Sequence, residues 1–265
     1  MMKISHALFP LLCLPALAGA GGYDNVVQAQ LRPGWRLPNG DHMAALHLTL
    51  APGWKTYWRA PGDAGIPPLF DWRGNQTSKV EVSWPAPHVF HQSGMRSVGY
   101  KGEVVLPLRV SLRHTGKDSR LRGIIDIGIC KDVCLPHRVR VEAILPATGG
   151  TPDPLIAAAM ADVPFSAAEA GVTAVHCKVG LSQAGMTLRT EIAMPRLSGT
   201  PDTVIETADP DIWVAEPETR WDGGLLVAET RLTHTTGGAF ALDRSGVRIT
   251  VIAGDMAVDI KGCDR

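Results

Sequence analysis

Apolar and polar residues alternate along much of the chain, and this period of two is typical of half-buried β-strands. Gly, Pro or Asn residues separate the alternating segments, which indicates turns between short strands. The pattern therefore predicts an all-β protein built as a sandwich of sheets. It is clearest at Val27–Leu31, Ala45–Leu50, Val104–Val110, Arg138–Ala143, Met186–Ile192 and Val247–Ile252.

One stretch rich in Gly and Pro divides the chain. It runs from Gly149 to Pro154, and the Ala-rich segment Leu155–Ala161 behind it is the one convincing helix candidate. We expect a first domain at 23–147, a short helical linker at 148–169 and a second sandwich at 170–265. Two domains also suit the length, because about 100–200 residues per domain is usual.

The first twenty residues predict export. Lys3 gives a basic start, an apolar run covers Ile4–Leu17, and the small residues Ala18–Ala20 resemble a cleavage site. Residues 1–20 are therefore expected to be a signal peptide. The run is shorter than the ~20 residues that span a bilayer. No later segment comes close, so we expect no membrane span after cleavage.

Charge and composition exclude one class of partner. Removing the signal takes away Lys3 and no acidic residue, which leaves 25 basic against 26 acidic residues. Such a balance makes nucleic acid an improbable partner. The apolar content of 45% is enough to bury a core.

Four cysteines follow the signal, and an even number in an exported protein suggests two disulfides. Cys177 lies in the first strand-like segment of the second domain, and Cys263 follows its last. Those two strands could be neighbours. A bridge would then close a long loop. In the chain-entropy model this closure raises the free energy of unfolding by roughly 4–5 kcal/mol, which indicates a structural disulfide. The alternative is two free thiols.

Cys130 and Cys134 need a different explanation, because the loop between them is too short for its closure to stabilise the fold much. Alternating residues flank both cysteines, which predicts a hairpin with one cysteine on each side of its turn. Opposed residues of a hairpin bring their Cβ atoms to ~4.5–5.5 Å, near the separation of a disulfide. Exposed disulfides have more oxidising reduction potentials than buried ones, and this favours thiol exchange at Cys130 and Cys134. Lys131 and His137 could favour the thiolate.

Two other interpretations of the same cysteines remain open. One is a structural staple across the hairpin. The other is metal binding, because thiolates, imidazole and thioether ligands suit copper(I), and cysteine with histidine suits zinc. We expect no metal and no cofactor as the first hypothesis, because no clear fourth ligand lies nearby. The candidate ligands are Cys130, Cys134 and His137, with His88, His91 and Met95 elsewhere in the domain.

Several blocks of the first domain together resemble a known family. The chain is similar to the N-terminal domain of the periplasmic disulfide reductase DsbD, and more closely to that of its relative ScsB, the suppressor of copper sensitivity protein. The combination is specific, although each block alone is not. The blocks are Gly53–Pro68, Trp84–Pro87, Ser97–Tyr100 and Gly128–Pro136.

The resemblance implies an immunoglobulin-like fold, so the expected architecture is two such sandwiches joined by the helical linker. It also implies a location in the periplasm of a Gram-negative bacterium and a protein-disulfide reductase type of activity. Cys134 would attack the partner and Cys130 would resolve the mixed disulfide. Electrons would come from thioredoxin-like proteins and a DsbD/CcdA-like membrane donor, and would pass to periplasmic oxidoreductases.

The chain also departs from the family pattern. DsbD-like domains have a longer spacing between the cysteines than the three residues found here. They cover the pair with an aromatic cap loop, and the matching stretch here runs from Phe90 to Met95, with Gln92 and Ser93 in place of acids. Pro136 completes the expected surroundings of the pair.

ScsB-like proteins continue into a membrane domain and a thioredoxin-like domain, whereas this sequence stops at Arg265. Alone, it is not expected to carry electrons across a membrane. Three hypotheses follow from the sequence: a thiol–disulfide exchange module, a copper-binding or copper-tolerance protein using the same thiols, and a structural adaptor for a redox partner.

Overall fold

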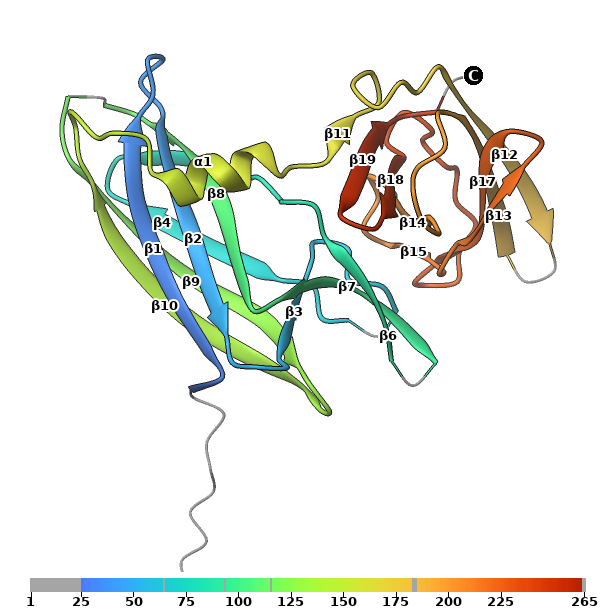
Figure 1. Cartoon of the computed structure of the whole chain (residues 1–265), viewed down its shortest axis with the longest axis horizontal. Coiled ribbons are helices and arrows are strands. Elements are labelled where there is room, and N and C mark those ends of the chain that lie inside the picture. The colour runs from blue at the N-terminus through green and yellow to red at the C-terminus, as the bar shows by residue number, and fades with distance from the viewer. Residues whose placement is uncertain (1–24, 64, 93, 115, 183–184, 264–265) are drawn as a thin grey trace, which may run out of the picture.

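The structure is a computed structural model that describes residues 25–63, 65–92, 94–114, 116–182 and 185–263. The predicted signal peptide at 1–20 lies outside these residues. The described part is mostly β-strand and contains one helix, so the predicted all-β class is confirmed. Strands β1 to β10 form one sandwich and β11 to β19 form a second, with helix α1 between them in the chain (Figure 1).

The first sandwich has two antiparallel sheets. One follows the order β1 (Val27–Arg36), β2 (His42–Leu50), β8 (Glu103–Leu112) and β5 (Thr77–Val82). The other follows the order β10 (Cys134–Leu145), β9 (Ser119–Cys130), β3 (Lys55–Tyr57), β7 (Met95–Lys101) and β6 (His88–Gln92), and β4 (Leu69–Gly74) also pairs with β9.

The alternation in β9 decides which residues enter the core of this sandwich. Ile125, Ile127 and Ile129 are buried in the apolar cluster shared by the two sheets. Their neighbours in the chain, Gly128 and Cys130, therefore lie on the outer face of the sheet, because successive side chains of a strand point to opposite faces. The core thus fixes the orientation of the first cysteine.

Helix α1 (Pro154–Ala161) covers the first sheet (Figure 1). Asp153 caps its N-terminus by accepting hydrogen bonds from the Leu155 and Ile156 amides, as N-cap carboxylates do. Ile156 is fully buried with Met43 and other apolar residues of the sheet. Arg32 of β1 forms an ion pair with Asp153 at 2.7 Å, so both the cap and the buried face attach the helix to the first sandwich.

The second sandwich has its own apolar core between two further sheets. One has the order β11 (Phe165–Ser166), β19 (Met256–Lys261), β18 (Arg248–Ala253) and β14 (Asp202–Glu206). The other has the order β12 (Ala174–Ser182), β13 (Gly185–Ala193), β17 (Leu225–His234) and β15 (Ile212–Val214), and β16 (Glu218–Asp222) also pairs with β17.

A disulfide between Cys177 and Cys263 connects the two sheets of the second sandwich. Cys177 lies on β12 of one sheet, and Cys263 follows β19 of the other. The disulfide therefore joins strands of two different sheets that face each other in the sandwich. Alternation indicates which side chains face inward, but it does not indicate which sheet a strand joins.

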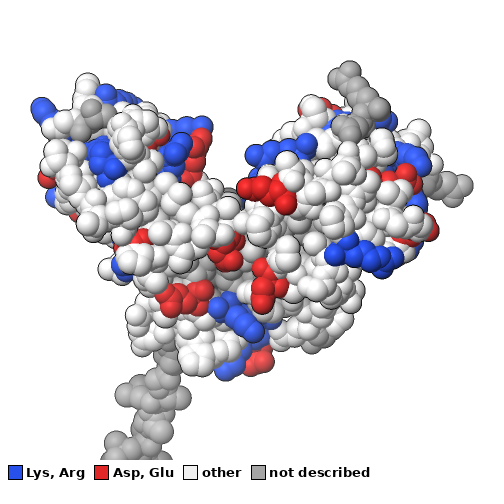
Figure 2. Space-filling model, turned by 45° about the horizontal axis from the view of Figure 1, so that its top comes forward, with Lys and Arg blue, Asp and Glu red and all other residues white. Residues whose placement is uncertain are grey.

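The two sandwiches share an apolar contact. Val204, Ile252 and Ala257 of the second sandwich belong to the core cluster of the first. Ion pairs flank this contact, including Arg59 with Glu206 at 2.9 Å. Figure 2 shows two lobes with a hollow between them, and positive and negative side chains are interspersed over the face in view. Among the described residues, no helix is long and apolar enough to cross a bilayer.

Candidate functional site

Cys130 and Cys134 close the tip of the β9–β10 hairpin. Strand β9 ends at Cys130 and β10 begins at Cys134, and the register places these two residues directly opposite each other. They form a disulfide, with 4.1 Å between their Cα atoms. The exposed turn 131–133 joins them, and the Lys131 amide donates a hydrogen bond to the Val133 carbonyl at 3.3 Å. The hairpin predicted from the sequence is therefore present.

The two sulfur-bearing residues differ in exposure. Cys130 is 7% exposed, because β9 lies inside its sheet and Lys55 of β3 pairs with Cys130 on the side away from β10. Cys134 is exposed, because β10 is the last strand in the order of the sheet. An approaching protein can thus reach Cys134 more easily than Cys130.

Tyr57 is the polar side chain in contact with the exposed cysteine. Its hydroxyl donates a hydrogen bond to the Cys134 Sγ at 3.1 Å, while the residue itself is only 5% exposed. Burial raises the pKa of Tyr57 above its ordinary value, so the hydroxyl keeps its proton and remains a donor. Such a donor stabilises negative charge on a sulfur.

A glycine makes room for this tyrosine. A Cβ added to Gly128 would lie 2.6 Å from Cδ2 of Tyr57 and 2.7 Å from Cβ of Ile66. Both distances are too short for real contacts, so only glycine allows these side chains to cover the strand here. Because Gly128 and Cys130 are two residues apart on β9, they share the outer face, and the Tyr57 ring is directed towards the disulfide.

The stretch that corresponds to the expected cap loop forms the β6–β7 hairpin, which contacts the turn 131–133 between the two cysteines (the redox turn). The Gln92 side-chain amide donates to the Lys131 carbonyl at 3.1 Å. Lys55 donates to Gln92 Oε1 at 2.7 Å, and its Nζ lies 5.0 Å from the centre of the Phe90 ring. Met95 is 58% exposed, and Ser93 lies outside the described residues.

The other expected neighbours of the cysteines occupy different positions. Pro136 pairs with Gly128 and lies on the same face of β10 as Cys134. His137 pairs with Ile127 and lies on the opposite face, because it is three positions from Cys134 along the strand. The Lys131 side chain packs against Gly53, where an added Cβ would lie 3.1 Å from its Cε. The position of His137 gives no support to a direct role at the sulfur.

Tyr57 and Lys55 are the site residues that sequence reasoning missed. The alternating pattern indicates only that Tyr57 belongs to a strand with a buried side, and it does not distinguish core packing from a contact with the cysteines. The available signal was the block Gly53–Pro68, which carries part of the family resemblance. The pairing of β3 with β9 at Cys130 explains why that block lies at the site.

Two of the candidate copper ligands outside the cysteine hairpin, His88 and His91, lie next to carboxylates of the second sandwich. His88 Nδ1 is 4.0 Å from Asp255, and His91 Nε2 is 3.7 Å from Asp202. Over the residues described, no group of three or more His, Cys, Asp or Glu side chains is arranged to hold a metal ion. Nothing in this arrangement brings the histidines to the cysteine pair.

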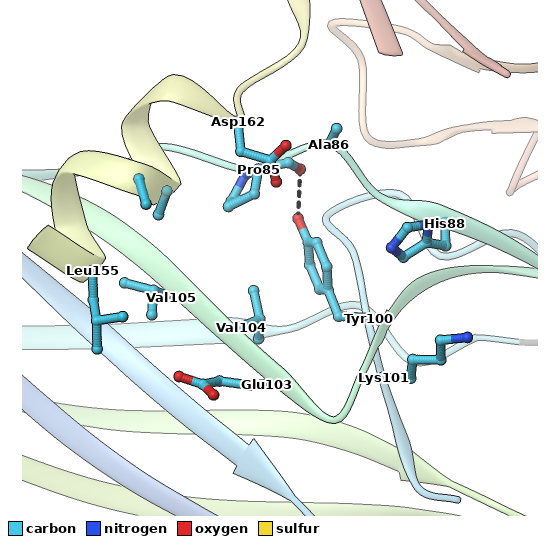
Figure 3. Close-up of a pocket in the computed structure, with 12 residues that line it drawn as sticks. Pro85, Ala86, His88, Tyr100, Lys101, Glu103, Val104, Val105, Leu155 and Asp162 are labelled. Atoms are coloured by element: carbon cyan, nitrogen blue, oxygen red, sulfur yellow. Dashed lines mark hydrogen bonds between the residues drawn. The ribbon is translucent and has the colours of Figure 1, made fainter. Parts of the chain in front are cut away.

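A separate pocket of about 460 Å³ lies between α1 and strands β7 and β8 (Figure 3). Val104, Val105 and Leu155 are among the apolar residues that line it, and the Tyr100 hydroxyl donates to the Pro85 carbonyl at 2.8 Å. Burial raises the pKa of Asp162 at its rim. His88, one of the candidate metal ligands, also lines this pocket, whereas Cys130, Cys134 and Tyr57 do not.

Comparison with known proteins agrees with this geometry. The structure resembles the crystal structure of the N-terminal periplasmic domain of ScsB from Proteus mirabilis, with a TM-score of 0.65 and 24% identity over 89% of this chain and 90% of that chain. This likeness shows that the two share a fold that includes both sandwiches.

The N-terminal domain of DsbD from Neisseria meningitidis, in the reduced form, matches with a TM-score of 0.30 and 14% identity over 48% of this chain and 90% of that chain. None of the curated protein sequences compared with the chain matches it. A family model described as "Thiol:disulfide interchange protein DsbD, N-terminal" matches residues 26–146. This segment contains the disulfide hairpin, Tyr57 and the β6–β7 hairpin, and it belongs to the DsbD N-terminal domain family.

Proposed function

We propose that this chain is a thiol–disulfide exchange module of the bacterial periplasm. It relays electrons from a thioredoxin-like donor to periplasmic oxidoreductases through Cys130 and Cys134. The observation that carries the proposal is the pairing of an exposed cysteine with a buried one at the tip of a hairpin. An exchange protein needs both, because one thiol must meet the partner and the other must resolve the product.

Reduction of a partner begins with the Cys134 thiolate. It attacks one sulfur of the partner's disulfide, that bond breaks, and the other partner sulfur leaves as a thiolate. Cys130, as a thiolate, then attacks Cys134 Sγ, and the second partner sulfur leaves. The Cys130–Cys134 bond forms again, and two electrons have moved to the partner.

The oxidised module is reduced again by the same steps in reverse. A thiolate of a thioredoxin-like dithiol attacks Cys134 Sγ, Cys130 leaves as a thiolate, and the second donor thiol completes the exchange. The donor would itself be reduced by a DsbD/CcdA-like membrane protein. The exposure of Cys134 supports it as the sulfur attacked in this direction too.

Tyr57 assists the attack on the partner in this proposal. When Cys134 is the attacking group, the Tyr57 hydroxyl stabilises its thiolate by a charge-assisted hydrogen bond. A thiolate is the nucleophile in disulfide exchange, so this contact raises the fraction of Cys134 ready to react at neutral pH.

Trapping of mixed disulfides tests the proposal. Cys130→Ser should accumulate covalent complexes through Cys134, because the resolving thiol is absent. Cys134→Ser should accumulate far fewer, because the remaining Cys130 is buried. Periplasmic extracts are quenched with acid and separated without reductant, with the membrane and thioredoxin-like proteins co-expressed. A double Cys177→Ser, Cys263→Ser variant is the control, and it should form no such complexes through Cys134.

Monomers alone in both single variants would refute the exchange role and leave a structural bridge as the explanation. A redox titration of the Cys130–Cys134 pair gives an independent measurement. A potential below about −300 mV would also contradict the proposal, because it is typical of structural disulfides that resist reduction.

A further inference from the structure

The β6–β7 hairpin has two faces that contact different parts of the molecule. His91 and Arg96 are directly paired across the hairpin, as are Gln92 and Met95. Directly paired residues share a face, and successive residues point to opposite faces. The His91–Arg96 face and the Gln92 face of the hairpin therefore point in opposite directions.

One face is attached to the second sandwich through a buried charge. The Arg96 side chain is 4% exposed. Its Nη1 lies 3.3 Å from Asp202 Oδ1 and donates to the Thr203 carbonyl at 3.1 Å, and its Nε lies 3.3 Å from Glu216 Oε1. His91 Nε2 lies 3.7 Å from the second oxygen of the same Asp202 carboxylate.

The other face is attached to the redox turn. Gln92 donates to the Lys131 carbonyl and accepts from Lys55, and Lys55 pairs with Cys130 across the sheet. The tip of the hairpin thus links the second sandwich to the turn that carries the disulfide. Figure 1 shows the hairpin between the second sandwich and the tip of β9–β10.

We propose that the second sandwich is a positioning domain that holds the β6–β7 hairpin against the redox turn, with Arg96 as the positioning residue. A buried guanidinium is held firmly where its partners are, because leaving it without them is strongly unfavourable. The position of the hairpin therefore depends on the position of the second sandwich. The other face of the hairpin then limits access to the buried Cys130 side of the disulfide.

The test weakens the attachment from the second sandwich and leaves Arg96 itself in place. The double variant Asp202→Asn, Glu216→Gln removes both negative partners at nearly constant shape. The matched control is Glu206→Gln, on the same strand β14, because Glu206 pairs with Arg59 and not with the hairpin. The conservative variant Asp202→Glu should behave like the unmodified protein.

Two measurements on the full chain give the result. Hydrogen exchange of the β6–β7 amides should become faster in the double variant. Reduction of Cys130–Cys134 by dithiothreitol should accelerate by about threefold or more, because local opening of the hairpin exposes the buried sulfur. Reduction of Cys177–Cys263 should keep its rate. Glu206→Gln should change neither quantity.

Unchanged amide exchange and reduction rates in the double variant would overturn the inference. So would an equal effect of Glu206→Gln, because the hairpin would then respond to domain docking in general. If the double variant does not fold, Asp202→Asn alone is measured in the same way. The inference rests on the site of the proposed function, but a small thiol needs no protein partner. The inference about the hairpin can therefore fail while mixed-disulfide trapping succeeds. Trapping can likewise fail while the hairpin responds as expected.

Discussion

At the scale of a single residue, the Tyr57 hydroxyl distinguishes Cys134 from Cys130. It bonds to the sulfur of Cys134, the exposed cysteine, from a side chain that is otherwise buried. Hydrogen bonds to charged groups contribute about 1.5–3 kcal/mol when the partner is ionised. The neutral disulfide gains less from the same donor, so the contact favours the reduced form.

Tyr57→Phe tests this contact. Loss of the hydroxyl should lower the potential of the Cys130–Cys134 pair by about 30 mV, which corresponds to ~1.4 kcal/mol for a two-electron couple. Alkylation of reduced Cys134 at neutral pH should also slow. Equilibration with glutathione measures the potential. Tyr100→Phe is the control, because its hydroxyl donates to a backbone carbonyl in the core, and that change should leave the potential as it is.

At the scale of elements, the alternating pattern predicted most of the strands and the hairpin at the cysteines. The period of two also predicts that His137 faces away from Cys134, because the two residues are three positions apart. The pairing of β3 with the end of β9 could not be predicted from the pattern, because it depends on how distant strands pack together. The contact of Tyr57 with Cys134 could not be predicted from the pattern for the same reason.

Gly128→Ala tests the packing of these elements. The added methyl group would overlap the Tyr57 ring and Ile66, and overpacking of this kind costs about 1–3 kcal/mol in the free energy of unfolding. Urea unfolding measures this loss. Displacement of Tyr57 should also lower the redox potential, as Tyr57→Phe does. Gly116→Ala is the control, because no atom lies within 4 Å of its added Cβ. Equal stability of the two variants would contradict the expected packing.

At the scale of the whole molecule, the two disulfides differ in their surroundings. Cys130–Cys134 closes an exposed turn, whereas Cys177 is buried where the two sheets of the second sandwich are bridged. Attack on a disulfide requires access to its sulfur, so the two bonds should differ in their rates of reduction.

Limited treatment with dithiothreitol should therefore open Cys130–Cys134 and leave Cys177–Cys263 intact. Mass mapping of alkylated cysteines identifies the thiols that are released. Replacing both Cys177 and Cys263 by Ser should lower the free energy of unfolding by roughly 4–5 kcal/mol, because the bridge closes a long loop. Preferential labelling of Cys177 would contradict the assignment of the two bonds.

The apolar contact between the sandwiches has a consequence for how the chain is divided. Val204, Ile252 and Ala257 complete the core of a sandwich to which their own strands do not belong. A fragment ending at the 148–169 linker would leave the facing apolar surface open to water, and such surfaces favour aggregation. The two sandwiches should melt in one cooperative transition. The linker is a boundary in the sequence, but we expect the unit of folding to extend across it.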